Sequence, residues 1–566
     1  MFCPKCGADV GDGGRFCPEC GDEVAETGAR EDAPAADRAR GGWLRRPLVL
    51  GAVALAVGVG VGVAVVSSIL AGDPPEDRAI ALVPADAAFY ATVHLDPSLG
   101  QKRAAKGVID RADGDAEPFE DAIGALVESA SPLSYERDIK PHLGNQVALF
   151  ARPSSDPTLL SATTNPEASR AAMRRLAEAS YPGSYYSLRE ATYRGQPYEH
   201  VVYADGGGTP PGSNAFAIID GFVVLGETSD VQMAIDARRG SSLADSSELA
   251  AARERLSEDV IGFAYLDAEP LAHAAGVDEY ASRAEVAPLE AIADAGPIAA
   301  TVSAGDGRLV LDIATRADAG EGSLLSGPST LLETLPADLT AALALGDIKG
   351  PLTSGSEATS EGAELLRDTA SELADLEFES DFAPWLGQLG LYLSGDDPDT
   401  VEYAFVAETT TPAESDRVID RIDDFYSSSY DDDYWYGSPV QSSEDGLGFD
   451  YTEGDDLLSV RGDDDRVVAG FGGAGFSAER ALDAEGGFGE SELYRRSADL
   501  LDGHEPFLSI DAARARLLLE RALDAEYSET YEHDIRPWLS GLDTVAGGVR
   551  TTGDGLHIRL VAGLGG

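Results

Sequence analysis

The segment VPADAAFYATVHLD, residues 83–96, has a close counterpart in LPADLTAALALGD, residues 335–347. In both, a Pro-Ala-Asp turn leads into a run of small and apolar residues that ends at an aspartate. A short apolar run that begins at turn residues is typical of a β-strand. The sequence therefore predicts that one strand-forming unit occurs twice, 252 residues apart.

Further pairs of similar segments follow in the same order. DIKPHLGNQVALF from Asp138 corresponds to DFAPWLGQLGLYL from Asp381, and SAGDGRLVLDI from Ser303 corresponds to TTGDGLHIRLV from Thr551. Six such pairs have separations between 243 and 252 residues. Ordered self-similarity at a nearly fixed spacing predicts two homologous halves, residues 73–320 and 330–566.

Strand patterns alternate with helical ones inside each half. GRLVLDIAT has the two-residue period of a strand, and PEASRAAMRRLAEA from Pro166 has the spacing of an amphipathic helix. Thr164 and Asn165 precede Pro166, as capping residues precede a helix that opens on proline. We expect an α+β fold, in which helices cover one face of an antiparallel sheet and the other face is partly wet.

All four cysteines lie in the first twenty residues. Cys3, Cys6, Cys17 and Cys20 form two Cys-x-x-Cys pairs, which together supply the four thiolates of a tetrahedral zinc site. Disulfide or redox chemistry fits less well, because a redox motif needs one such pair in an α/β domain. We predict a zinc ribbon over residues 1–24, and with four protein ligands its zinc is structural. The segment resembles the zinc-ribbon module found at the N-termini of bacterial and archaeal membrane proteins.

A single uncharged stretch follows the ribbon. Residues 47–71 contain no charged side chain and are long enough to cross a bilayer as one helix. A cleaved signal peptide is the alternative, but its apolar core is usually shorter. Arg38, Arg40, Arg45 and Arg46 precede the stretch, so the positive-inside rule places the N-terminus in the cytoplasm and residues 73–566 outside. Residues 25–46 are expected to form a flexible linker.

These predictions place the protein in the cell membrane as a single-pass protein with the bilayer as a partner. Ala54, Gly58 and Gly62 recur every four residues, a spacing that favours close helix pairing and a homodimer. Because four cysteines fill the coordination sphere of the zinc ion, we expect the ribbon to serve as a contact with another protein. The predicted architecture is thus a zinc ribbon, one transmembrane helix and a duplicated antiparallel-sheet-plus-helix outer domain.

The net charge of -58 results from 42 basic and 100 acidic residues. Residues 1–46 carry only -2 of it, so the predicted outer region carries -56. Such a surface repels phosphate backbones, which excludes nucleic acid as a partner of the outer region. We expect the outer region to require salt for full stability, because added ions screen its self-repulsion.

Tyrosine-rich loops occur at equivalent places in the two halves. Aromatic rings among Ser and Asp are typical of loops that bind sugars or peptides, so an envelope polymer or peptide is a candidate ligand. A solvated loop is the alternative reading. The candidate residues are Tyr181, Tyr185, Tyr186, Tyr426, Tyr430, Tyr434, Trp435 and Tyr436.

Residues 78–566, which open on ALVPADAAFYATVHLDPSLGQK, resemble a family of bacterial membrane-anchored proteins with a duplicated outer domain of unknown function. The resemblance brings no activity with it. No common hydrolase or metalloprotease motif occurs, GFGGAG at residues 470–475 is interpreted as a glycine-rich turn, and the seven histidines show no metal-ligand spacing.

We therefore predict a non-catalytic protein that binds or scaffolds the envelope. Two alternatives stay open: a transmembrane sensor that signals to the ribbon, and an extracytoplasmic hydrolase that uses acidic residues.

Overall fold

The computed structural model describes the chain between Glu76 and Gly565, with gaps. The described ranges are 76–111, 133–153, 155–180, 186–204, 214–277, 296–305, 307–315, 329–346, 386–398, 400–409, 416–417, 419–420, 441–442, 448–453, 456–463, 465–473, 478–482, 487–522, 531, 536–552 and 555–565. The predicted ribbon, linker and transmembrane helix lie outside these ranges. Among the described residues, no helix combines the length and the hydropathy needed to cross a membrane.

Twenty strands in the described ranges belong to one sheet, and the pairings between them are antiparallel. The first ten are β1 (Phe89–His94), β2 (Leu143–Ala151), β3 (Thr158–Thr163), β4 (Tyr186–Tyr193), β5 (Gln196–Tyr203), β6 (Asn214–Ile219), β7 (Phe222–Glu227), β8 (Gly262–Leu266), β9 (Ile298–Gly305) and β10 (Arg308–Thr315). Their order across the sheet is β4-β5-β6-β7-β3-β2-β1-β8-β9-β10.

The other ten strands repeat this pairing order. They are β11 (Ala341–Leu345), β12 (Leu386–Ser394), β13 (Glu402–Thr409), β14 (Gln441–Ser442), β15 (Gly448–Glu453), β16 (Asp456–Gly462), β17 (Arg466–Gly473), β18 (Glu505–Asp511), β19 (Leu542–Thr552) and β20 (Gly555–Leu564). They run β14-β15-β16-β17-β13-β12-β11-β18-β19-β20. Each strand of the first series thus has a counterpart with the same neighbours in the second.

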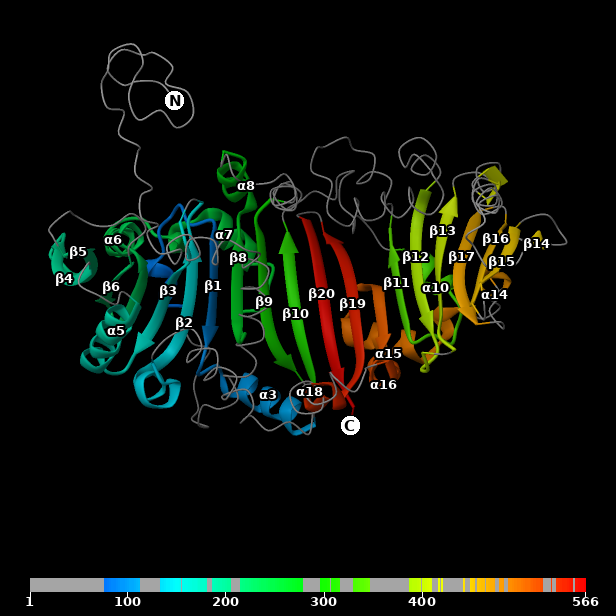
Figure 1. Cartoon of the computed structure of the whole chain (residues 1–566), viewed down its shortest axis with the longest axis horizontal. Coiled ribbons are helices and arrows are strands. Elements are labelled where there is room, and N and C mark those ends of the chain that lie inside the picture. Colours follow the sequence, from blue (N-terminus) through cyan, green and yellow to red (C-terminus); the bar gives the residue numbers. More distant parts are fainter. Residues whose placement is uncertain are drawn as a thin grey trace, which may run out of the picture. The chain divides into compact units, whose positions relative to one another are not determined.

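The two series join through their last strands. β10 pairs with β20 in antiparallel register from Arg308 opposite Gly563 to Ala314 opposite His557. Because both strands end their series, this one pairing makes the sheet continuous across the two halves (Figure 1).

Helices connect the strands of both series. The helices are α3 (Leu99–Arg111), α5 (Pro166–Ser180), α6 (Thr228–Ala237), α7 (Ser247–Arg253), α8 (Ala268–Val277), α10 (Leu331–Thr334), α14 (Glu479–Leu482), α15 (Glu492–Leu501), α16 (Ala512–Ala522) and α18 (Arg536–Ser540), with short turns of helix at η1 (Ala79–Leu82), η2 (Tyr135–Ile139), η3 (Lys140–His142), η4 (Leu243–Asp245) and η7 (Phe488–Glu490). α5 begins where the sequence predicts, because the Ala168 N–H donates to Asn165 Oδ1 at 3.2 Å.

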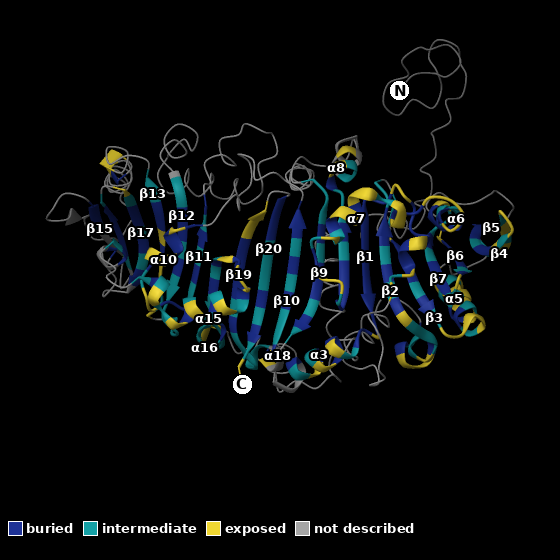
Figure 2. Cartoon of the chain, turned by 180° about the vertical axis from the view of Figure 1, so that it is seen from behind, coloured by how far each residue is buried: buried dark blue, intermediate teal, exposed yellow. Residues whose placement is uncertain are grey.

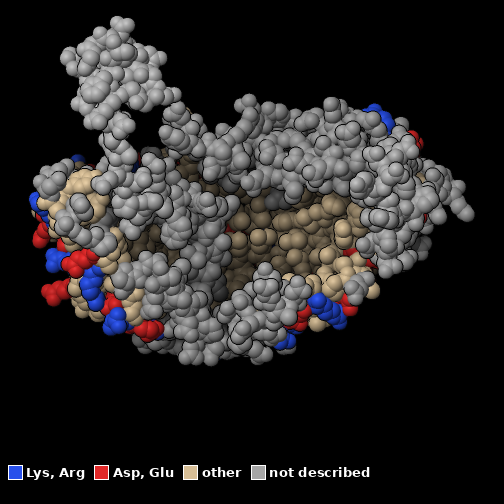
Figure 3. Space-filling model, in the orientation of Figure 1, with Lys and Arg blue, Asp and Glu red and all other residues tan. Residues whose placement is uncertain are grey.

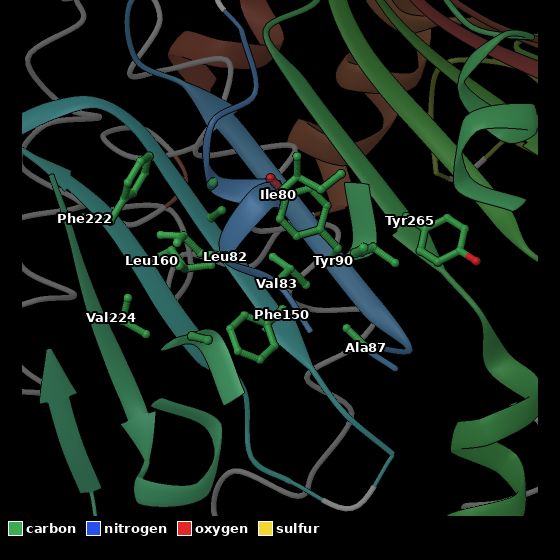
Figure 4. Close-up of a cluster of buried hydrophobic side chains, with 14 of the residues drawn as sticks. Ile80, Leu82, Val83, Ala87, Tyr90, Phe150, Leu160, Phe222, Val224 and Tyr265 are labelled. Atoms are coloured by element: carbon green, nitrogen blue, oxygen red, sulfur yellow. The ribbon is translucent and has the colours of Figure 1, made fainter. Parts of the chain in front are cut away.

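The main hydrophobic core lies on one face of the first series. Tyr90, Phe150, Leu160 and Phe222 are 0–1% exposed and pack against η1 and α6 (Figure 4). A second cluster around Leu332 and Phe488 occupies the corresponding place in the second series. The α+β prediction is confirmed, since the structure is a mostly antiparallel sheet with helices.

Candidate functional site

The face of the sheet opposite these cores is apolar as well, and we call it the open face. Residues directly opposite each other on neighbouring strands share a face. One row of such residues crosses both halves, and it consists of Val93, Gly262, Val302, Leu311, Leu560, Gly547, Leu508, Leu343, Leu391 and Phe405. No charged residue occurs in this row.

In the middle of the sheet, several residues of the open face are less buried than their sequence neighbours. Buried and half-buried residues alternate along β11, from residue 309 to 314 of β10 and from residue 560 to 564 of β20 (Figure 2), and the half-buried positions include Leu311, Leu343 and Leu560. Phe405 is 37% exposed and Tyr403, on the same face, is 45% exposed. Figure 3 shows a hollow lined by uncharged residues over the middle of the sheet. A wet sheet face normally carries polar residues at such positions, whereas the half-buried positions of this row are apolar.

The open face is therefore a feature of the described residues that is suited to bind a partner. Contiguous apolar surface of this kind marks an interaction site on a soluble domain. Its chemistry is restricted: it offers dispersion contacts and burial of apolar area, and the row across its centre offers no ionic side chain.

A polar cluster lies on the other face, at the joint between the two series. Asp312 on β10 is 5% exposed, and His557 on β20 and His504 before β18 are 8% and 3% exposed. One ligand atom from each of the three lies within 4.8 Å of the others. The seven histidines show no metal spacing in the sequence, but the fold brings two of them together.

The end of α15 positions His504. Asp502 and Gly503 adopt left-handed backbone conformations, with φ of 52° and 81°, which end the helix and turn the chain into β18. The His504 ring then places Nδ1 2.7 Å from the Leu501 carbonyl oxygen and Nε2 3.0 Å from His557 Nδ1. The two imidazoles meet edge to face, with centroids 4.7 Å apart.

Arg559 joins the cluster from β20. Its Nε and a terminal nitrogen donate to the two oxygens of Asp312 at 2.7 and 3.1 Å, a bidentate pair between the two series. Burial alone would raise the pKa of Asp312. The hydrogen bonds and charges of His557 and Arg559 outweigh burial and lower this pKa to about 2. Burial lowers the pKa of His504, so this ring is neutral at pH 7.

A second polar network in the first series is built around Asp77. Its oxygens accept hydrogen bonds from Tyr90 at 2.6 Å, Gln146 at 2.7 Å and Arg253 at 2.5 Å. A cavity of about 560 Å³ lies beside it, lined by Arg78, Asp220 and Arg238 among others. The charges there pair with each other, since Arg238 contacts Asp220 at 2.5 Å. We interpret this network as structural.

Most of the residues predicted from sequence as ligand sites lie outside the described ranges. These are the four cysteines, Tyr181, Tyr185, Tyr426, Tyr430, Tyr434, Trp435 and Tyr436. Tyr186 is described: it begins β4 and stacks on Tyr203 with centroids 5.7 Å apart. In the GFGGAG segment, β17 continues through Gly473 and pairs antiparallel on both sides. Residues 470–473 therefore form a strand and not the turn interpreted from the sequence. A dinucleotide fold requires a parallel strand at this place, and β17 is antiparallel to its neighbours.

The structure thus combines an antiparallel sheet with helices and an apolar open face, and α3 packs through Ala105 against Ala304 and Leu309 where β9 meets β10 on that face. A family model described as protein of unknown function (DUF3352) matches residues 48–432, and a zinc-ribbon domain model matches residues 2–24. The first match covers more than half of the chain, which therefore belongs to the DUF3352 family. Four thiolates at this spacing suit zinc.

No curated protein matches the sequence. Among solved structures, the chain is similar to crystal form IV of TP0453, with 11% identity and a TM-score of 0.23 over 43% of this chain and 80% of that one. Crystal form I of TP0453 matches with 10% identity and a TM-score of 0.21 over 44% of this chain and 80% of that one. At these TM-scores the likeness adds nothing to the fold described above.

Proposed function

We propose that the protein is a non-enzymatic, single-pass membrane protein whose duplicated outer domain holds lipid acyl chains on the open face. The observation that carries this proposal is the uncharged row that crosses both series, in which Leu311, Leu560 and Leu391 are half-buried. The repeated pairing order of β1–β10 and β11–β20 supports the duplication.

The chain length between anchor and domain supports lipid as the occupant. The predicted transmembrane helix ends at residue 71, and the described structure begins at Glu76. Four intervening residues extend at most about 14 Å, so the anchor holds the outer domain against the bilayer. Acyl chains are the most abundant apolar groups at that position.

The charge distribution disfavours the other candidate occupants. The net charge of -56 on the predicted outer region repels acidic polymers. Sugars and peptides require polar groups that fix their orientation, and the row across the open face has none. Acyl chains require only apolar area.

The proposal is tested by photo-cross-linking of the full chain in its own membrane. A photoreactive amino acid replaces Leu311 or Leu391 on the open face, or Leu517 on α16 as the matched control, because Leu517 is also exposed (38%). We expect adducts of lipid mass at positions 311 and 391 and none at 517. Equal lipid adducts at all three positions, or only protein cross-links at 311 and 391, would contradict lipid as the occupant.

A further inference from the structure

We propose that His504 and His557, with Asp312 as the outer partner that orients His557, form a binding site for a divalent transition-metal ion of the kind that imidazole ligands prefer. The site is separate from the predicted zinc ribbon and lies on the face opposite the open face. Its groups come from both series, because Asp312 belongs to β10 and His557 to β20.

A count of hydrogen atoms points to a missing cation. The Leu501 carbonyl can only accept, so His504 Nδ1 carries its proton and Nε2 presents a lone pair. Ionised Asp312 can also only accept, and its Oδ1 lies 3.3 Å from His557 Nε2. If the His557 proton is on Nε2, the lone pairs of His557 Nδ1 and His504 Nε2 face each other at 3.0 Å.

The opposite tautomer does not remove the conflict. A proton on His557 Nδ1 would satisfy His504 Nε2, but it would leave the His557 Nε2 lone pair against the Asp312 carboxylate. His557 Nε2 is also a buried atom without a hydrogen-bond partner in this geometry. Arg550 can donate to His557 Nδ1 when the His557 proton is on Nε2, but the lone pair of His504 Nε2 then still faces His557 Nδ1 without a hydrogen between them. A cation bound between the two nitrogens resolves this conflict.

The geometry suits a metal ion between the two imidazoles. Two nitrogens bound to one tetrahedral zinc ion at about 2.0–2.1 Å lie about 3.3 Å apart, so the observed separation of 3.0 Å needs to widen only slightly. The far nitrogen of each ring faces an oxygen that would orient it: the Leu501 carbonyl for His504 and Asp312 for His557. Such outer partners are typical of histidine ligands.

Arg550 is the competitor of the metal ion. Its terminal nitrogen lies 3.3 Å from His557 Nδ1, and the Arg550 residue is exposed. Its guanidinium can turn to solvent when a metal ion binds. Removal of this side chain is therefore expected to strengthen metal binding, whereas removal of a histidine abolishes it.

The first test counts metal ions on the full-length protein by native mass spectrometry after dialysis against Zn²⁺. We expect two zinc ions per wild-type chain, one of them in the ribbon, and one per chain in His504→Ala and His557→Ala. His142→Ala is the matched control and should keep two, since within the described ranges the hydrogen bonds of His142 are accepted by its backbone carbonyl. One zinc ion per wild-type chain would overturn the proposal. The cation between His504 and His557 would then be a proton shared by the two imidazoles.

A second test does not depend on the stability of the histidine variants. The second test is a Co²⁺ titration, in which the histidine site is distinguished from the ribbon because its spectrum lacks thiolate charge-transfer bands. The Co²⁺ affinity of the histidine site should be about tenfold higher in Arg550→Ala than in the wild type, because a charged hydrogen bond no longer competes for His557. Arg495→Ala removes an exposed arginine of α15 as the control and should leave that affinity unchanged. Equal Co²⁺ affinities in the wild type and Arg550→Ala would contradict the assignment.

Discussion

At the scale of single residues, Asp77 stabilises the first series through hydrogen bonds from three side chains. The side chain is 8% exposed and receives donors from Tyr90, Gln146 and Arg253. Its loss leaves buried polar groups without a partner. We expect Asp77→Ala to lower the free energy of unfolding by about 2–4 kcal/mol, measured by urea denaturation.

Asp86→Ala is the matched control for Asp77. Asp86 is 57% exposed and lies 3.5 Å from Arg152. Exposed ion pairs contribute little, so we expect a change below about 1 kcal/mol. Equal losses in the two variants would show that the three donors around Asp77 find other partners.

His94 on β1 makes stability depend on pH. Burial lowers its pKa, Asp77 raises it less, and Arg253 lowers it. The unfolded chain therefore takes up a proton first as the pH falls through about 6.5, so His94 destabilises the fold increasingly below that pH. His94→Phe should remove this contribution, which is at most about 1.4 kcal/mol per pH unit.

The measurement for His94 compares urea denaturation at pH 7 and pH 5 in the wild type and in His94→Phe. The wild type should lose more stability over this interval than the variant. His200 and His504, whose pKa values are also lowered, are present in both proteins and cancel in the comparison. Parallel losses would assign the pH dependence to groups other than His94.

At the scale of elements, the N-terminus of α5 depends on one side chain. Asn165 Oδ1 accepts from the Ala168 N–H, and Pro166 opens the helix. We expect Asn165→Ala to destabilise the protein by about 1 kcal/mol and Asn165→Asp to preserve stability, because aspartate retains the acceptor. Thermal unfolding of the three proteins checks this, and an Asp variant as unstable as the Ala variant would argue against a capping role.

The strands and α5 are predictable from sequence because their signals are local: a two-residue period, a capping residue and a proline. The open face carries a weaker signal. β11 (AALAL) and the LGLYL segment of β12 have apolar residues at both odd and even positions, which indicates a strand with two apolar faces. The His504–His557–Asp312 cluster has no local signal, since its members are far apart in sequence and Asp312 meets the two histidines through the pairing of β10 with β20.

At the scale of the whole molecule, charge and duplication act together. The two series join through one strand pairing, and the predicted outer region carries a net charge of -56. Its self-repulsion is screened over about 10 Å at 0.1 M salt. We expect the melting temperature to rise from low to molar NaCl, measured by calorimetry on the full chain. A flat or falling melting temperature would show that specific ion pairs outweigh the repulsion.

The central claim, that the open face holds acyl chains, is tested most directly by native mass spectrometry of the full-length protein released from its own membrane. We predict that the wild type retains lipid and that Leu311→Asp and Leu391→Asp, which place a carboxylate on the open face, retain less. Because all three proteins share residues 47–71, lipid bound at the predicted anchor cancels. Equal lipid retention in the wild type and both variants would contradict the claim.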